Sequence, residues 1–480
     1  MTDGRSSADE APWGPVPPPA ADAGARADVR VLRAGSPRLT AILDDDPTGS
    51  QSVRDVQVVL SLEPAEYREA LRSGACFVLT NSRSLGAAQA AGVAGQVADD
   101  LFAIAAATDR RLELVSRSDS TLRGHVLPEV RALSEASVRA TGGGFDAVLF
   151  APAFIEAGRV TAGDVHWAGG EGGFRPVSET EFARDSSFGY RSSNLRDFLA
   201  ERGGGELSPD RVASIGLADI REHGPQRVAD LIAGAPPGGF VIVNALEYSD
   251  LEIVALGALL AEEQGAALLY RTGPSFVRAL LGQGPSMPLT PEQIWPAGRP
   301  HGHGLVVVGS HVGRTSRQLA ALERLGGWSA VELEVGAFLA MDGPAAEQFL
   351  AAIAGRVCDL LSRGDVVVFT SRGLVRATAG ADDLEIARRV SAAVSSVAGL
   401  ALAARPAWVL AKGGITAHDV AARGLRMRRA EVAGQFFPGL VSMMRPLSAS
   451  PEAVGRPYVI FAGNVGDDNA LADVAGRLRG

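Results

Sequence analysis

The chain has few cysteines, few aromatic residues and no long hydrophobic run. Its 480 residues include two cysteines, Cys76 and Cys358, and 6% aromatic residues. The cysteines lack a metal-ligand spacing and partners for a disulfide framework, so we expect both to be reduced and buried. No apolar stretch approaches the roughly 20 residues that span a bilayer, and residues 1–37 lack the apolar core of a signal peptide. We therefore expect a cytoplasmic protein without a membrane role.

Positive charge is scarce as well. Lys and Arg total 46 against 55 Asp and Glu, which gives a formal net charge of −9. Such a chain has no general field that would attract nucleic acid or anionic lipid. An anionic ligand must therefore be held by a local pocket.

The composition and its patterning predict an α/β protein with two domains. A chain of this length exceeds what one hydrophobic core usually organises. Short β-branched or Leu-rich runs alternate with helix-length stretches in both halves, so we predict a mainly parallel sheet flanked by helices in each domain. The predicted strands are Thr40–Leu43, Asp55–Leu60, Cys76–Thr80, Leu112–Val115, Ala147–Phe150, Phe240–Asn244, Ala267–Tyr270, Leu305–Val308, Ala330–Leu333, Val366–Thr370, Trp408–Leu410 and Tyr458–Phe461.

Composition also suggests where the domains begin and end. We predict a disordered extension at 1–37, a first domain at 38–284, a Pro/Gly-rich linker at 285–303 and a second domain at 304–480. His301 and His303 stand in the linker without a cysteine or carboxylate nearby. We interpret them as solvated residues and not as metal ligands.

Three adjacent carboxylates, Asp44, Asp45 and Asp46, follow the first predicted strand and precede a Pro/Gly turn. Neighbouring like charges raise the cost of ionising one another, so a substrate, a cation or a proton must offset the repulsion. Ligands of open parallel sheets bind beyond the carboxyl ends of the strands, which is where this cluster falls. A solvated acidic turn, with an Asp capping the next helix, is the alternative.

Polar residues also follow the predicted strands Cys76–Thr80 and Leu112–Val115. Arg83 stands after one, and Asp119, Ser120, Arg123 and Gly124 stand after the other. These strand ends supply carboxylates that accept a hydroxyl proton, amides and hydroxyls that bind oxygens, and arginines that bind a carboxylate or phosphate. Alternatively, the Ser-Asp-Ser-Thr stretch caps a helix and Arg123 pairs with a helix carboxylate such as Glu129.

Residues 151–185 form a long segment without clear periodicity and with too many apolar and aromatic residues for disorder. We interpret it as a substrate-covering loop, with Arg159 and His166 as its functional candidates. A structural role for His166 is an equal alternative.

Glycine-rich turns follow three strands of the second half. Their candidate residues are Ser310, Lys412, Gly413, Gly414, Ile415, Thr416, Gly463, Asn464 and Gly466. Small residues let backbone amides approach a nucleotide, and free amides at a helix N-terminus favour phosphate. The chain has no Walker A loop, because Gly-x-x-x-x-Gly-Lys-Ser/Thr does not occur in it. Lys412 is its only lysine. Either a lysine is needed at a phosphate site, where arginine is not equivalent, or its occurrence here is due to chance.

On these motifs the chain resembles the four-carbon acid sugar kinase family from about residue 38 onward. The family's Ala-Asp-Asp-Leu-Thr-Gly motif corresponds to Asp44–Gly49, its Asp-Ser-Thr-Leu-Arg-Gly to Asp119–Gly124, and its Pro-Ala-Phe…Glu-Ala-Gly-Arg loop to Pro152–Arg159. Its Gly-Ser turn corresponds to Gly309-Ser310, its Gly-Gly-x-Thr to Gly413–Thr416, and its Gly-Asn-Phe-Gly-Asp to Gly463–Asp467. Asp44, Pro47, Lys412 and Val465 depart from the family pattern, which affects the choice of substrate more than the reaction.

The resemblance implies that the chain phosphorylates a small sugar acid with ATP and Mg²⁺, in a cleft between the domains. It implies a catalytic base at Asp45 or Asp46 and ATP binding by the glycine-rich turns. The residues implied to bind the acid are Asp44, Arg83, Asp119, Ser120, Arg123, Gly124, Arg159 and His166. No residue is assigned to the metal. The implied partners are the acid and ATP, with a homodimer as a further expectation and without nucleic acid or membrane.

Two other functions stay open from the residues alone. The acidic cluster, with His166 as a ligand, would suit a divalent metal in an aldolase or lyase that acts on sugar acids. A non-catalytic sensor would bind acid or nucleotide and change conformation without turnover.

Overall fold

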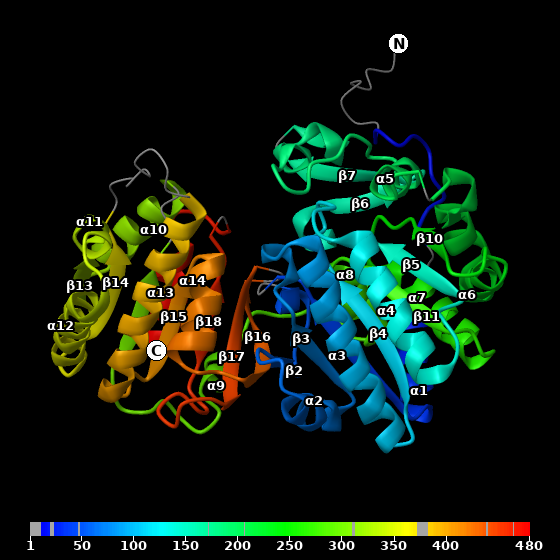
Figure 1. Ribbon diagram of the computed structural model, residues 1–480. Helices are drawn as coiled ribbons and strands as arrows, with labels where there is room; N and C mark the ends of the chain where they lie inside the picture. The colour runs from blue at the N-terminus through cyan, green and yellow to red at the C-terminus, as the bar shows by residue number, and fades with distance from the viewer. Residues whose placement is uncertain are drawn as a thin grey trace, which may run out of the picture. The chain divides into compact units, whose positions relative to one another are not determined.

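The computed structural model describes residues 11–19, 24–46, 49–170, 172–205, 207–309, 313–371, 383–437, 440–463 and 465–480. Its contacts divide the chain into two compact units, each of which is described by itself (Figure 1). Unit 1 consists of Met1–Ser52 and Tyr67–Pro285, and unit 2 consists of Val53–Glu66 and Ser286–Gly480.

Unit 1 is built on a parallel sheet with the strand order β3-β1-β4-β11-β5-β10-β9. The strands are β1 Arg38–Asp44, β3 Ala75–Leu79, β4 Arg111–Arg117, β5 Ala147–Ala151, β9 Ala213–Ile215, β10 Gly239–Val243 and β11 Leu268–Thr272. β1 is buried along its whole length, as expected for a strand covered on both faces. Because β1 pairs in parallel with β3 and β4, the carboxyl ends of these three strands lie side by side.

Helices flank this sheet (Figure 1). They are α1 Ala25–Gly35, α3 Ala87–Ala107, α4 Val126–Thr141, α5 Leu195–Arg202, α6 Leu217–Ala233, α7 Tyr248–Glu263 and α8 Pro274–Leu280, while α2 Pro64–Ala70 contains the boundary between the units. α3 packs against α4, and α7 packs against α1, α6 and α8.

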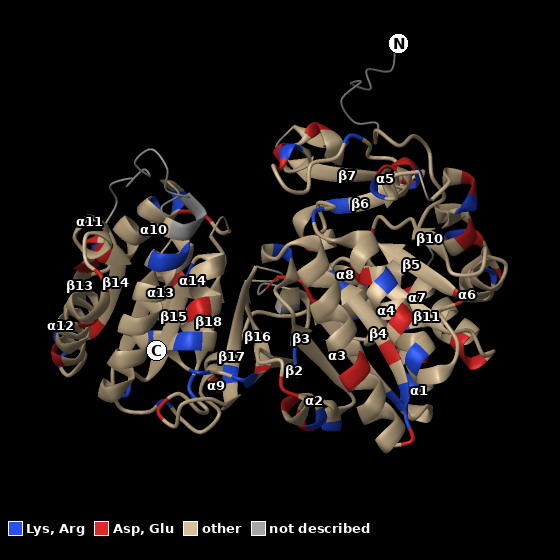
Figure 2. Cartoon of the chain, in the orientation of Figure 1, with Lys and Arg blue, Asp and Glu red and all other residues tan. Residues whose placement is uncertain are grey.

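Helix α1 corrects the prediction of a disordered extension at residues 1–37 for its part Ala25–Gly35. Val29 is fully buried, Arg26 pairs with Glu252 of α7 at 2.7 Å, and Arg33 pairs with Glu113 of β4 at 2.9 Å. Basic residues of α1 thus lie beside acidic residues of the sheet and of α7 (Figure 2). The scattered charges that suggested a solvated extension are partners of buried carboxylates.

The segment 151–185 is also more regular than predicted. It contains a three-stranded antiparallel sheet of β6 Arg159–Ala162, β7 Val165–Gly170 and β8 Gly173–Pro176. These strands have only 4, 6 and 4 residues, too few to show a clear period of two. The prediction of an irregular loop is therefore wrong for these residues.

Unit 2 has the strand order β13-β14-β12-β15-β18-β17-β16-β2. The strands are β2 Val56–Val59, β12 Gly304–Val308, β13 Trp328–Leu333, β14 Asp365–Thr370, β15 Trp408–Lys412, β16 Arg429–Phe437, β17 Val441–Ser448 and β18 Tyr458–Phe461. The first five strands in this order, β13, β14, β12, β15 and β18, are parallel. The strands β17, β16 and β2 are antiparallel to their neighbours. The helices are α9 Pro291–Ile294, α10 Gly313–Arg324, α11 Val335–Leu339, α12 Gly343–Leu361, α13 Asp383–Ala401, α14 Gly414–Asp419 and α15 Ala470–Arg479.

Every predicted strand coincides with an observed strand, and two assignments change. β2 pairs with β16, so residues 53–66 pack in unit 2 although they were predicted in the first domain. Residues 286–303 of the predicted linker also belong to unit 2, and Leu289 and Ile294 are buried in its core. His303, in the same segment, is 39% exposed and lies 3.9 Å from Asp365.

Two helices are longer and more apolar than the sequence analysis allowed. α3 and the stretch Ile386–Ala404 meet the length and composition of a membrane span, and half of each apolar window is buried inside the protein. Core helices of globular proteins have this character, so neither helix by itself indicates a membrane role.

Candidate active site

Asp44 and Asp45, at the end of β1, are buried with 3% exposure each. This contradicts the alternative of a solvated acidic turn. The Asp44 carboxylate accepts hydrogen bonds from Arg117 Nη1 at 2.9 Å and from the Asp46 backbone N–H at 3.2 Å. Burial outweighs the Arg117 contact and raises the pKa of Asp44 to about 7, with a smaller contribution from repulsion by Asp45 and Asp46. Asp44 can therefore hold a proton near neutral pH.

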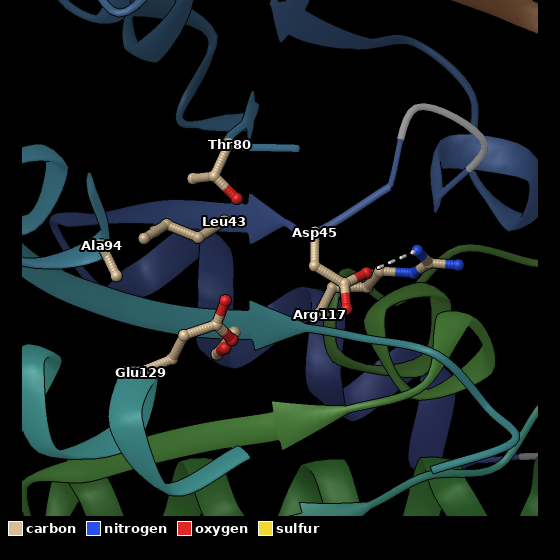
Figure 3. A pocket seen from close by; sticks show the side chains of 7 residues that line it. Leu43, Asp45, Thr80, Ala94, Arg117 and Glu129 are labelled. Carbon is tan, nitrogen blue, oxygen red and sulfur yellow. Dashed lines mark ion pairs between the residues drawn. The ribbon is translucent and has the colours of Figure 1, made fainter. Parts of the chain in front are cut away.

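Asp45 is held between two arginines. Its Oδ1 lies 2.7 Å from Arg83 Nη2. The same oxygen lies 3.7 Å from Arg117 Nη1 (Figure 3). Arg83 also reaches Asp46, at 3.3 Å. Burial raises the pKa of Asp45 even though Arg83 opposes the shift. A carboxylate with a raised pKa and a fixed orientation has the properties of a general base.

A small pocket lies next to Asp45 in unit 1 (Figure 3). It is lined by Leu43, Asp45, Thr80, Ala94, Ser116, Arg117 and Glu129. Glu129 accepts a hydrogen bond from the Ser82 hydroxyl and forms an ion pair with Arg271. The alternative pairing of Arg123 with Glu129 is therefore wrong.

Arg271, at the end of β11, is a site residue that the sequence analysis missed. It is fully buried, and its Nη1 donates to Ser116 Oγ at 2.6 Å. Its Nη2 has no hydrogen-bond partner within the described part of the chain. This atom lies 3.6 Å from the position that a Cβ on Gly124 would occupy. The rule that ligands bind at the carboxyl ends of parallel strands would also have identified Arg271 if it had been applied to β11.

Three arginines surround Asp119, which follows β4. Asp119 pairs with Arg123 at 2.6 Å. Burial favours its neutral form, but Arg83, Arg123 and the Thr121 hydroxyl outweigh burial and lower the pKa of Asp119 to about 2. The guanidiniums of Arg123 and Arg159 lie 5.1 and 5.6 Å from the centre of one aromatic ring, that of Phe182. The 151–185 segment thus brings Arg159 next to the residues that follow β4.

His166 is a structural residue in this arrangement. It is fully buried, its Nε2 donates to the Ser120 carbonyl oxygen at 2.8 Å, and its Nδ1 accepts from the Thr161 hydroxyl at 2.9 Å. Burial lowers the pKa of His166 to about 4, so the ring is neutral near pH 7. With both ring nitrogens bonded, His166 fixes the Ser120 segment and is not a metal ligand. The prediction of a direct substrate contact from its ring nitrogens does not fit this geometry.

In unit 2, Gly309, Gly413 and Gly463 follow the neighbouring strands β12, β15 and β18. The Gly309 N–H donates to the Lys412 carbonyl oxygen at 3.3 Å. A Cβ on Gly309 would lie 2.2 Å from Thr416 Oγ1, so this close approach requires a glycine. The three predicted nucleotide-binding turns therefore begin at the ends of three adjacent strands.

The remaining candidates of unit 2 differ in their surroundings. Gly414 and Ile415 begin α14, and the Ile415 side chain is 59% exposed. Gly466 has a φ of +75°, and a Cβ there would lie 2.4 Å from Ala470. α14 has six residues and continues as the π-helical turn Val420–Gly424, so a phosphate at this turn would depend on backbone amides more than on a helix dipole. Ser310 and Asn464 lie outside the described residues.

Lys412 ends β15 and points into unit 2. Its Nζ donates to the carbonyl oxygens of Ala462 and Gly463 at 2.8 and 3.0 Å and lies 4.1 Å from the centre of the Phe461 ring. Burial lowers the pKa of Lys412 to about 7, and nearby Arg314 adds to this shift. Lys412 Nζ therefore contacts the Gly463 turn from inside the protein.

Comparison with solved structures identifies the same fold in other proteins. A Haemophilus influenzae protein of the DUF1537 family is 16% identical and superimposes with a TM-score of 0.62 over 91% of this chain and 99% of that one. A Salmonella typhimurium LT2 protein is also 16% identical, with a TM-score of 0.65 over 91% of this chain and 98% of that one. At this identity the likeness supports the α/β fold alone.

Comparison of sequences goes further. A family model described as a sugar-binding N-terminal domain matches residues 40–280, and one described as a nucleotide-binding C-terminal domain matches residues 305–471. A Bordetella bronchiseptica protein named D-threonate kinase is 29% identical over 413 residues, which cover 84% of this chain and 85% of that protein. These matches cover both units, and the chain belongs to the four-carbon acid sugar kinase family.

Proposed function

We propose that the protein transfers the γ-phosphoryl group of ATP to a hydroxyl of a four-carbon sugar acid, such as threonate, erythronate or 3-oxo-tetronate. Its family and its similarity to a D-threonate kinase support a sugar-acid kinase. The observation that carries the proposal is the position of Asp45, a buried carboxylate held by Arg83 and Arg117 beside a cluster of arginines.

The arginine cluster suits the carboxylate of the substrate. Arg83, Arg123 and Arg159 lie around the Asp119 carboxylate. Arg83 also pairs with Asp45 and Asp46, and Arg123 lies 3.7 Å from Asp185. Arg159 Nε is buried and has no hydrogen-bond partner within the described part of the chain. Guanidiniums bind carboxylates through paired, charge-assisted hydrogen bonds. We assign the acid group of the substrate to these arginines and to the backbone of Ser120 and Gly124.

The acidic cluster suits the hydroxyl that attacks. We assign the base to Asp45, with Asp46 as the second candidate because it is less buried and shares Arg83. Because burial raises the pKa of Asp44 to about 7, its protonated form is available near neutral pH and can donate a hydrogen bond to another hydroxyl of the acid. His166 would act through Ser120, whose carbonyl oxygen it holds.

The glycine turns of unit 2 suit the phosphates of ATP. Gly413, Gly414, Thr416, Gly463 and Gly466 stand where close backbone approach is possible, and we assign the nucleotide to them. When bound with ATP, Mg²⁺ would neutralise charge on the transferred group. Within the described residues no group of three or more His, Cys, Asp or Glu side chains is arranged to hold a metal. We therefore expect the nucleotide phosphates to supply most of its ligands.

The test is ADP release from ATP and Mg²⁺ with a panel of erythronate, threonate and 3-oxo-tetronate stereoisomers. Asp45→Asn should lower turnover by about 10²- to 10⁴-fold, the usual contribution of a general base. Asp55→Asn is the matched control, because that side chain is 73% exposed. Equal turnover of the two variants would remove Asp45 from the base role.

The same experiment separates the rival functions. Nucleotide binding without turnover on any acid would favour a sensor. Metal-dependent cleavage of an acid without nucleotide would favour a lyase, although His166 has no free ring nitrogen for a metal in this structure.

A further inference from the structure

Lys412 combines three features that a merely structural side chain does not need. It is the only lysine of the chain, it is fully buried, and it stands between the Gly309, Gly413 and Gly463 turns. Buried cations are costly unless they are paired or hydrogen-bonded. Among the described residues, the partners of Lys412 are the carbonyl oxygens of Ala462 and Gly463 and the face of the Phe461 ring, so dipoles and not a carboxylate interact with its Nζ.

These contacts fix the orientation of the turn. In a planar trans peptide, the N–H points away from the preceding C=O. Because the Ala462 carbonyl oxygen faces Lys412 Nζ at 2.8 Å, the Gly463 N–H, which lies in the same peptide plane, points in the opposite direction, away from Lys412. Lys412 thereby sets the direction of an amide donor in a turn that we assign to the nucleotide.

We propose that Lys412 is a positioning residue of the nucleotide site, which holds the Gly463 turn in its binding shape and takes up a proton from solvent when nucleotide phosphates bind. The proposal rests on the proposed nucleotide-binding function of unit 2. The amine gains one proton and becomes an ammonium, and no other bond changes.

The direction of the effect follows from electrostatics. Without nucleotide, burial and the Arg314 guanidinium at the start of α10 disfavour the ammonium and lower the pKa of Lys412 to about 7. The negative charge of bound phosphates favours the ammonium and raises this pKa. Nucleotide affinity should therefore fall as the pH rises above about 7, by up to about tenfold per pH unit while a full proton is taken up.

The experiment is calorimetric titration of the full chain with ADP and Mg²⁺ at about pH 8, in two buffers that differ in ionisation enthalpy. The difference between the two binding enthalpies gives the number of protons taken up. At this pH the nucleotide phosphate, with a second pKa of about 6, contributes little. We expect uptake of about half a proton or more, and an ADP affinity about three- to tenfold weaker at pH 8 than at pH 7.

Two variants separate positioning from folding. Lys412→Arg keeps a permanent cation and should bind ADP with little proton uptake and little pH dependence between about pH 7 and pH 9. Lys412→Met keeps the apolar stem and should bind ADP more weakly, also without uptake. Binding of ADP to the unaltered protein without proton uptake would overturn the proposal, as would equal uptake by Lys412→Met. Absence of ADP binding to the unaltered protein would instead overturn the nucleotide-binding function itself.

Discussion

Replacing Gly124 by alanine tests the position of Asp45 without removing any polar group. Gly124 has a φ of +115°, and its Cβ would lie 3.0 Å from Asp45 Oδ2 and 3.6 Å from Arg271 Nη2. Ordinary contacts of carbon are about 3.5 Å or longer. Asp45 must therefore move, although Arg83 holds it at 2.7 Å.

The magnitude has two parts. A backbone conformation that suits glycine costs other residues about 1–3 kcal/mol of folding free energy. Displacement of a reacting group by about 1 Å costs on the order of 10²-fold in rate, and the 3.0 Å contact requires Asp45 to move by a few tenths of an ångström. We expect Gly124→Ala to lower kcat by up to about tenfold.

The assay pairs steady-state ADP release with urea unfolding, and Gly142→Ala is the control. Gly142 follows α4 with a φ of +80°, and no atom lies within 4 Å of its Cβ position. The control should lose about 1 kcal/mol of stability and keep its turnover. If Gly124→Ala turned over substrate as fast as Gly142→Ala, the placement of Asp45 as the base would be refuted.

Three further predictions concern stability. Burial lowers the pKa of His166 to about 4, whereas its value in the unfolded chain is about 6.5. The neutral ring therefore stabilises the fold above about pH 6.5, and the free energy of unfolding falls by about 3 kcal/mol as the pH drops to about 4. Urea unfolding of His166→Asn should show a flatter pH dependence. Arg271→Met leaves the buried Glu129 charge unpaired and should cost about 3–5 kcal/mol, and thermal unfolding of the double variant with Glu129→Gln should recover much of that loss. Gly309→Ala forces a methyl group against Thr416 at a cost of about 1–3 kcal/mol, and strictly additive losses in a cycle with Thr416→Ala would contradict this contact.

Much of the fold could be predicted because parallel strands are covered on both faces. β12 is buried over its whole length and is a continuous apolar run, and β1, also buried throughout, contains the apolar stretch Ala41–Leu43. β16 alternates buried and half-buried residues and is interrupted by a register shift near Gly434, so it has no such run. Helix α1 was missed because its stability comes from carboxylates far away in the sequence, such as Glu252.

Part of the site could be predicted because the strands themselves were predicted. The rule that ligands bind at strand ends singled out Asp44, Asp45 and Arg83, which the structure brings together. The strand-end rule could not assign ion-pair partners, because the pair of Glu129 and Arg271 joins residues that are 142 positions apart in the sequence. It also could not separate a structural from a catalytic His166, since only the fold shows that both ring nitrogens are used.

The most direct test of the kinase account follows the γ-phosphate of ATP. The protein is incubated with Mg²⁺, ATP labelled in that phosphate, and each four-carbon acid in turn, and the products are separated by mass. We expect the label in a phosphorylated acid for at least one stereoisomer, with its formation slowed by Asp45→Asn and unchanged by Asp55→Asn. Label that stays in ATP, or that appears only as inorganic phosphate with every acid, would contradict the account.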